Sequence, residues 1–120
     1  MILIDSSIWI DHINHGEPGL HAFLQLDEAL MHPHVLGEVA LGSFRQRNRW
    51  LPRLEILPIA KLAEEDHVLH LIESRSLFST GVGYTDAHLL ASCLLMRCPI
   101  WTRDKRLHKQ SERLGVAYKP

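Results

Sequence analysis

The chain opens with Met1-Ile2-Leu3-Ile4-Asp5-Ser6-Ser7, a short apolar run that ends at an acid and two hydroxyls. Such a run is typical of a buried strand, and in open α/β sheets ligands bind at the carboxyl ends of the strands. Near the other end, Pro99-Ile100-Trp101-Thr102-Arg103-Asp104 has the same order of apolar residues, hydroxyl and acid. We therefore expect Asp5 and Asp104 to lie at strand ends that belong to one site.

The composition is that of an ordinary globular chain, with 46% hydrophobic and 22% charged residues among 120. We expect a single domain over residues 1–120, large enough to bury a core without disulfides. No apolar run reaches the roughly 18–20 residues that span a bilayer, and the N-terminus lacks a signal-peptide pattern. Cys93 and Cys98 make no disulfide framework, so we expect reduced thiols and a cytoplasmic protein without a membrane partner.

The formal net charge is −1, but the basic residues are clustered. If a metal neutralises four of the 14 acids, the 13 basic residues exceed the remaining acids by three. Two clusters are candidates for phosphate contact or for plain solvated faces. They are Arg45, Arg47, Arg49 and Arg53, and then Arg97, Arg103, Lys105, Arg106, Lys109, Arg113 and Lys119.

Apolar strand candidates alternate with segments of helical periodicity along the whole chain. After the opening run, strands are expected at 29–31, 55–59, 100–102 and 116–118. Helices are expected at 7–13, 18–26, 35–44, 61–78 (the longest), 84–96 and 105–114, and 45–53 is expected to be helical in part and interrupted by Pro52. This alternation predicts parallel β-α-β units in a three-layer α/β/α sandwich.

Each acid, taken alone, has a simple structural explanation. Asp5, Asp86 and Asp104 all stand where a helix can begin, and an aspartate there satisfies free backbone N–H groups. Glu38 is different, because it lies among apolar residues and is costly to bury without a partner. That partner could be Arg45 or Arg47, or it could be a metal.

Taken together, the four acids favour a metal site. Four converging carboxylates would repel one another without a counter-ion and raise their own pKa values. Oxygen ligands without His or Cys suit Mg²⁺ or Mn²⁺ rather than Zn²⁺. Such a site polarises a phosphate oxygen, activates a water for in-line attack and stabilises the leaving 3′-oxygen. We therefore expect Asp5, Glu38, Asp86 and Asp104 to be catalytic metal ligands in an enzyme that hydrolyses RNA.

Four segments resemble, in order, the motifs of the PIN-domain nucleases, and most closely those of the VapC-type toxins of bacterial toxin–antitoxin pairs. They are Ile4-Asp5-Ser6-Ser7, Val35-Leu36-Gly37-Glu38-Val39, Thr85-Asp86-Ala87 and Trp101-Thr102-Arg103-Asp104. The resemblance covers essentially the whole chain. One stretch departs from it, because Gly81-Val82-Gly83-Tyr84 replaces the Pro/Ala-rich lead-in common in the family, which affects the expected pose of the Asp86 helix and the choice of substrate.

The resemblance implies a PIN-like parallel sheet of about five strands in the order 3-2-1-4-5. It also implies a divalent-metal endoribonuclease that forms a homodimer and is inhibited by a small cognate antitoxin. By motif match, the four acids inherit the metal-binding roles, and Ser6 and Thr102 match the hydroxyl positions that support them.

Other residues have alternative roles. Arg103, Lys105 and Arg106 adjoin Asp104 and are candidates to grip RNA phosphates. Asp11, further along the helix after Asp5, is expected to be structural or to support the site.

Two alternatives to metal-dependent cleavage stay open. Two of the nine histidines could serve a metal-free ribonuclease, although zinc-finger spacing is absent. The chain could also be a non-catalytic PIN-like module that binds protein or RNA and whose acids only cap helices.

Overall fold

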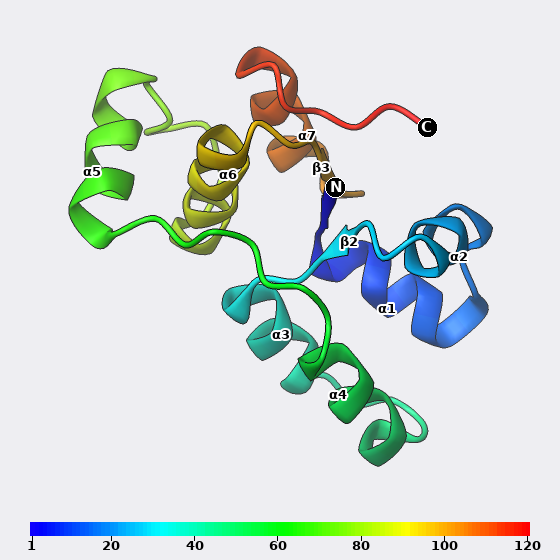
Figure 1. Ribbon diagram of the computed structural model, residues 1–120. Coiled ribbons are helices and arrows are strands. Elements are labelled where there is room, and N and C mark those ends of the chain that lie inside the picture. Colours follow the sequence, from blue (N-terminus) through cyan, green and yellow to red (C-terminus); the bar gives the residue numbers. More distant parts are fainter.

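A small parallel sheet forms the centre of the computed structural model, which describes all residues 1–120 (Figure 1). Its strands are β1 (Ile2–Ile4), β2 (Ala29–Leu30) and β3 (Ile100–Trp101), in the order β2-β1-β3. In the central strand, Leu3 lies opposite Leu30 on one side and Ile100 on the other. A central parallel strand is covered on both faces, which explains why β1 is apolar until it ends at Asp5.

The expectation of about five strands is wrong, since three form. The segments expected at 55–59 and 116–118 each contribute a single bridge, Ile59 to Met31 and Ala117 to Ile100. Prolines limit the first of these ladders: Pro58 lacks an N–H, and Pro33 starts a helix soon after β2. The two bridging segments nonetheless lie next to β2 and β3, on the outer sides of the sheet. These are the positions of the two outermost strands in the expected order 3-2-1-4-5.

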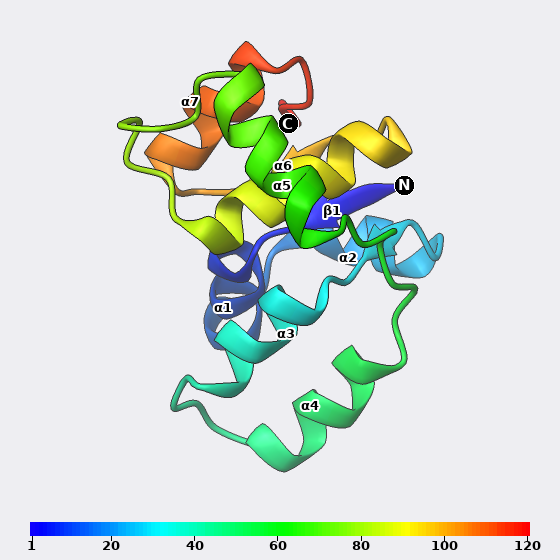
Figure 2. The same ribbon diagram turned by 90° about the vertical axis from the view of Figure 1, so that its left-hand side faces the viewer.

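Seven helices surround the sheet. They are α1 (Ser6–His15), α2 (Pro18–Gln25), α3 (Pro33–Ala40), α4 (Arg47–Glu55), α5 (Glu65–Ser74), α6 (Tyr84–Met96) and α7 (Lys105–Arg113). Helices α5, α6 and α7 lie on one side of the sheet, and α1, α3 and α4 lie on the other (Figures 1 and 2). The expected α/β architecture with a parallel sheet between helical layers is therefore confirmed. No helix is both long and apolar enough to cross a bilayer.

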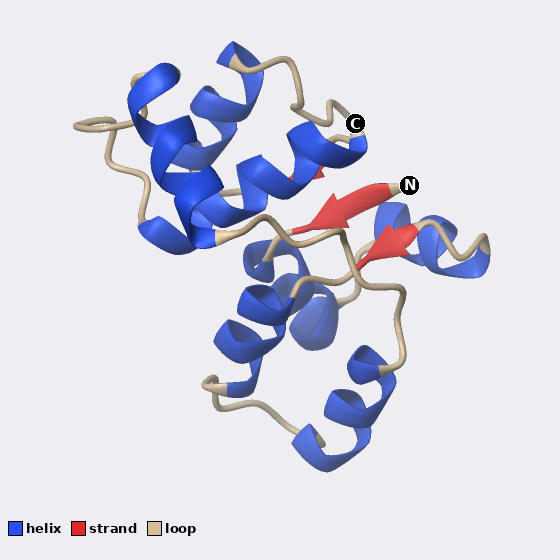
Figure 3. Cartoon of the chain, turned by 60° about the vertical axis from the view of Figure 1, so that its left-hand side comes forward, coloured by secondary structure: helices blue, strands red, loops and turns tan.

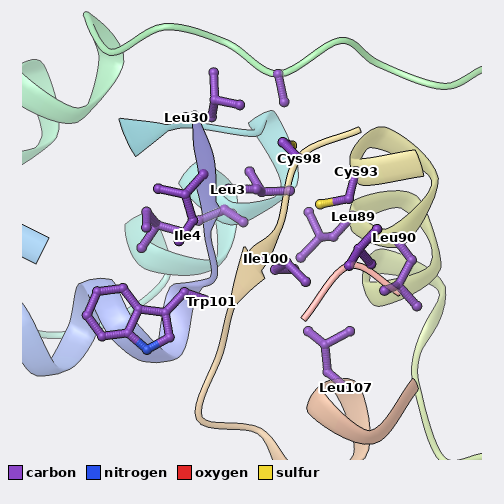
Figure 4. Close-up of a cluster of buried hydrophobic side chains, with 14 of the residues drawn as sticks. Leu3, Ile4, Leu30, Leu89, Leu90, Cys93, Cys98, Ile100, Trp101 and Leu107 are labelled. Atoms are coloured by element: carbon purple, nitrogen blue, oxygen red, sulfur yellow. The ribbon is translucent and has the colours of Figure 1, made fainter. Parts of the chain in front are cut away.

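The core lies where α6 packs on the sheet. Every residue of α6 from Ala87 to Cys93 is buried, so this helix is the most enclosed in the chain. Leu89, Leu90 and Cys93 face the side chains of β1 and β3, as Figure 4 shows. This packing holds the first turn of α6 at the carboxyl end of the sheet, next to the end of β1.

Two helix predictions need correction. The helix expected at 61–78 covers only α5, and α6 is the longest helix with 13 residues. Residues before α5 are held in a coil, where the Lys61 N–H contacts the Met96 sulfur at 3.1 Å, and Ser76 has a positive φ of 53° that ends helical geometry. Pro52 lies inside α4 without interrupting it. Figure 3 shows α4 as a continuous helix.

Candidate active site

Asp5 ends β1 and precedes α1, but its carboxylate does not cap that helix. The Asp5 side chain is only 5% exposed, and its Oδ2 accepts hydrogen bonds from Thr102 Oγ1 at 2.6 Å and Ser7 Oγ at 2.8 Å. Its other oxygen has no hydrogen-bond partner in the protein. Helix capping therefore does not explain this buried acid, whose charge is held by two hydroxyls alone.

The two hydroxyls join the two ends of the chain. Thr102 Oγ1 also accepts from the Asp104 N–H at 3.0 Å, and Ser7 Oγ accepts from the Arg103 N–H at 3.0 Å. Thr102 thus supports Asp5 as expected, whereas Ser6 makes no such hydrogen bond and Ser7 takes that place. Ser6 and Ser7 are adjacent in the first turn of α1, so the sequence does not distinguish them.

Asp104 caps α7 with one carboxylate oxygen, and its other oxygen has no hydrogen-bond partner in the chain. Its Oδ1 accepts from the N–H groups of Arg106 at 2.9 Å and Leu107 at 3.1 Å. Its Oδ2 accepts no hydrogen bond and the residue is exposed. Capping uses one oxygen, and the second remains open to the site.

Asp86 lies in the first turn of α6. Its Oδ2 accepts from the Gly83 N–H at 3.2 Å, which closes that turn as a capping contact. Burial raises the pKa of Asp86, the Gly83 hydrogen bond opposes that rise, and the charges of Asp5 and Asp104 add to it. Asp86 is thus held by the lead-in at 81–84 and lies close enough to Asp5 and Asp104 for their charges to act on it.

Glu38 projects from α3 and forms no ion pair. Neither Arg45 nor Arg47 pairs with it, and the Arg47 guanidinium instead donates to the Ala40 carbonyl. Partial burial raises the pKa of Glu38, and the charges of Asp5 and Asp86 raise it further. The alternative of a structural Glu38–arginine pair is therefore wrong.

The four acids form one electrostatic group. Asp5 and Asp86 act on Glu38, and Asp5 and Asp104 act on Asp86. Asp5, Asp86 and Asp104 come from element ends or first turns at the carboxyl edge of the sheet, and Glu38 comes from within α3. As the side chains lie, no three His, Cys, Asp or Glu groups converge closely enough to hold one metal ion between them. We call this group the carboxylate cluster.

The neighbouring basic residues differ in how free they are. Arg103 is engaged, since it pairs with Asp11 at 2.8 Å and with Glu17, and its guanidinium lies 5.9 Å from the Trp101 ring. This ion pair gives Asp11 a structural contact. Lys105 and Arg106 are exposed in the first turn of α7 and form no ion pair.

Beside the carboxylate cluster lies a group of three histidines, His32, His34 and His88, which we call the histidine cluster. The ring of His34 lies 5.1 Å from that of His32 and 4.7 Å from that of His88. One buried nitrogen on each ring, His32 Nε2, His34 Nδ1 and His88 Nε2, has no hydrogen-bond partner, although His88 Nε2 lies 3.6 Å from Glu65 Oε1. Burial and the neighbouring histidines lower the pKa of His32 to about 4. Sequence reasoning missed this grouping, because His88 is far from the other two in the chain.

Comparison with known proteins defines the class. A family model described as "PIN domain" matches residues 2–112. The chain belongs to the PIN-domain family. Among its relatives is Ribonuclease VapC32 of Mycobacterium tuberculosis, in strains CDC 1551 / Oshkosh and ATCC 25618 / H37Rv, which is 42% identical over 118 residues. That alignment covers 98% of this chain and 95% of each relative, and it confirms the VapC-type resemblance seen in the motifs.

Proposed function

We propose that this protein is a divalent-metal-dependent endoribonuclease of the VapC type, and that Asp5, Glu38, Asp86 and Asp104 form its catalytic site. One observation carries the proposal: the buried Asp5 carboxylate caps no helix and meets no cation within the chain. A buried charge of this kind is costly unless it serves a ligand. The VapC32 relatives, named as ribonucleases, support RNA as the substrate.

The residues of the carboxylate cluster fit Mg²⁺ or Mn²⁺. The donors are all carboxylate oxygens, which these hard cations prefer. Mg²⁺ is usually held by one or two carboxylates, with water and substrate phosphates completing its shell, so three preformed protein ligands are not required. When bound, the ion would polarise the scissile phosphate and supply an activated water. Asp5 and Asp104 would hold it, with Glu38 and Asp86 completing the site.

The chain's own hydroxyls then have a positioning role. Thr102 and Ser7 donate to the same oxygen of Asp5 and leave its other oxygen free to face a ligand. Thr102 also binds the Asp104 N–H, so one side chain orients both strand-end acids. Lys105 and Arg106 follow Asp104, are exposed and form no ion pair, and we assign them to RNA phosphates, whereas Arg103 is held by Asp11 and Glu17.

Two protein partners complete the proposal. As the antitoxin-binding site we propose the groove of about 360 Å³ between α1, α2 and α4, lined in part by Trp9, Leu24 and Trp50.

As the homodimer interface we propose the outer face of α5 and α6, where Leu69 and Leu95 are exposed. Light scattering of the purified protein, before and after Leu69→Asp, tests the dimer. Persistence of the same dimer in the variant would place the interface elsewhere.

Cleavage of total cellular RNA tests the nuclease. The wild type is incubated with Mg²⁺ or Mn²⁺ and with EDTA, beside Asp5→Asn and a matched control, Asp27→Asn. Asp27 is an exposed turn residue with φ of 55°, a conformation that asparagine tolerates well. We expect metal-dependent fragments with 5′-phosphates from the wild type and the control, and none from Asp5→Asn.

The remaining outcomes separate the alternatives. Cleavage that survives both EDTA and Asp5→Asn, and leaves cyclic phosphates, would assign the chemistry to histidines. If Glu38→Gln kept full cleavage, the carboxylate site would be refuted. Absence of cleavage together with absence of Mg²⁺ or Mn²⁺ binding in a calorimetric titration would leave a non-catalytic binding module.

A further inference from the structure

A cavity of about 160 Å³ lies between the end of α5 and the start of α6. Its walls are mainly apolar and include Leu77, Val82, Gly83 and Ala87, and the rings of Phe78 and Tyr84 stand at its edge. Both rings are unusually open to solvent for aromatic side chains, with 55% of Phe78 and 43% of Tyr84 exposed. Neither ring is needed to fill the core, so their placement calls for another explanation.

The cavity borders the carboxylate cluster. Gly83 lines it and donates its N–H to Asp86 Oδ2 at 3.2 Å, so one turn of backbone separates the two sites. Tyr84 stands two residues before Asp86 in the same first turn of α6. This is the stretch, 81–84, in which the sequence departs from the family's usual lead-in.

The Tyr84 ring is exposed but held in place. Its hydroxyl donates to Glu65 on α5, and its ring meets that of His88 edge-on, with centroids 4.7 Å apart and planes at 87°. A ring anchored at two points loses little further freedom when it binds a flat partner, which favours binding. Tyr84 therefore has the properties of a stacking platform.

A cation lies at the opposite side of the same loop. A Cβ built on Gly81 would lie 2.7 Å from Arg106 Cδ, so the stem of Arg106 rests directly on this glycine. Arg106 belongs to the first turn of α7, which Asp104 caps. Figure 2 shows the segment running from α5 past α7 to the start of α6. The loop is thus flanked by the carboxylate cluster, by Arg106 and by the two exposed rings.

We propose that this cavity binds one nucleobase of the RNA, next to the phosphate that is cut, with the base against Phe78 and Tyr84 and its phosphate near Arg106. The identity of the occupant rests on the proposed ribonuclease function. The chemistry agrees with it, because aromatic rings beside a basic side chain are how proteins hold single-stranded bases. The cavity, of about 160 Å³, can admit only a small group such as a single base. Recognition there would set which base flanks the cut.

Nucleotide binding without catalysis is the test. Amide NMR spectra of the full chain are recorded without divalent metal, during titration with each of the four nucleoside 5′-monophosphates and with ribose 5-phosphate. We expect at least one nucleotide to shift the amides of Gly81, Gly83 and Ala87, while ribose 5-phosphate does not. Tyr84→Ala should weaken that binding about ten-fold, the loss of one stacked ring. Tyr84→Phe keeps the ring and loses only the hydroxyl contact with Glu65, so it should retain most of the binding, and the distant Ile56→Ala should bind as the wild type does.

A second readout links the cavity to cleavage. A randomised RNA pool is cut by the wild type and by Tyr84→Ala, and the fragments are sequenced; we expect the variant to lose its base preference at one position beside the cut. The proposal is overturned if nucleotides and ribose 5-phosphate give the same shifts, if no shift occurs at the cavity, or if Tyr84→Ala changes only the oligomeric state. If the protein bound nucleotides but cut no RNA, the proposed ribonuclease function would be refuted, whereas the proposed base-binding role of the cavity would still be supported.

Discussion

Helices α3 and α6 each contribute one member to two neighbouring clusters of like groups. Glu38 and Asp86 belong to the carboxylate cluster, while His34 and His88, nearby on the same two helices, belong to the histidine cluster. The first cluster reaches solvent through the exposed Glu38 and Asp104. The second is enclosed, with His32 2% and His88 5% exposed.

The comparison shows why one cluster needs an outside partner and the other does not. A histidine can shed its charge near neutral pH, and His32 does so, since burial and its neighbours hold its pKa at about 4. Carboxylates stay ionised near neutral pH, so the repulsion between their negative charges remains until a cation or a proton binds. Clustering of carboxylates at a solvent edge thus indicates ligand binding, whereas the histidine cluster includes the interior residue His32, which is neutral near pH 7.

The largest expected effect separates capping from catalysis at Asp104. Asn is as good a helix cap as Asp, so Asp104→Asn keeps the hydrogen bonds to Arg106 and Leu107 and removes only the charge. We expect RNA cleavage to fall roughly a thousand-fold, as for loss of a metal-bound charge, with little change in thermal unfolding. Full activity of the Asp104→Asn protein would show that Asp104 only caps the helix and has no catalytic role.

Thr102 tests the positioning of the carboxylate cluster. Thr102→Val keeps the shape but leaves Asp5 Oδ2 and the Asp104 N–H each without one partner. Loss of such supporting contacts costs roughly ten- to a hundred-fold in activity or metal affinity, and we expect kcat and Mg²⁺ affinity to fall in that range. Thr102→Ser, which retains the hydroxyl, should recover most of both. Equal activity of the two variants would contradict the role.

His32 tests the interior cluster through pH. Its pKa is lowered from 6.5 to about 4 in the folded chain, so as the pH falls below 6.5 the unfolded chain takes up a proton first. The folded chain is therefore more stable above that pH, and its free energy of unfolding decreases as the pH falls toward about 4. The expected decrease from this group is about 2 kcal/mol between about pH 7 and about pH 5. His32→Asn retains an acceptor for the His34 N–H and cannot titrate.

Urea unfolding of the wild type and His32→Asn at both pH values measures the difference. The wild type should lose more stability than the variant on acidification. Parallel losses in the two proteins would show that His32 is not the group that responds.

The smallest expected effect is on the stability of the metal-free protein, which the repulsion within the carboxylate cluster lowers. The pKa of Glu38 is raised, so its ionised form is disfavoured by folding and the penalty grows as the pH rises through that pKa. Glu38→Gln should raise the unfolding temperature by roughly 2 °C at neutral pH and by nothing at about pH 4, because solvent screens a partly exposed charge. Glu73→Gln, an exposed residue of α5 without an ion pair, is the control. A gain that persists at low pH would have another cause.

Much of this arrangement could be predicted from the sequence. The apolar run before Asp5 and the one before Asp104 placed both acids at strand ends, and the apolar surroundings of Glu38 marked it as an acid that needs a partner. Three features were beyond sequence reasoning because they depend on three-dimensional contacts. The outer strands are reduced to single bridges, Ser7 rather than Ser6 contacts Asp5, and Arg103 is held by Asp11 and Glu17.

The hydrogen bond from Thr102 to Asp5 spans 97 positions of the chain. During synthesis, the first strand, Asp5 and Ser7 leave the ribosome early, but Thr102, the other residue that orients Asp5, is made late. A nascent chain therefore carries an incomplete site, and a truncated product that stops before β3 has no route to completing it. This order delays completion of the site until late in synthesis.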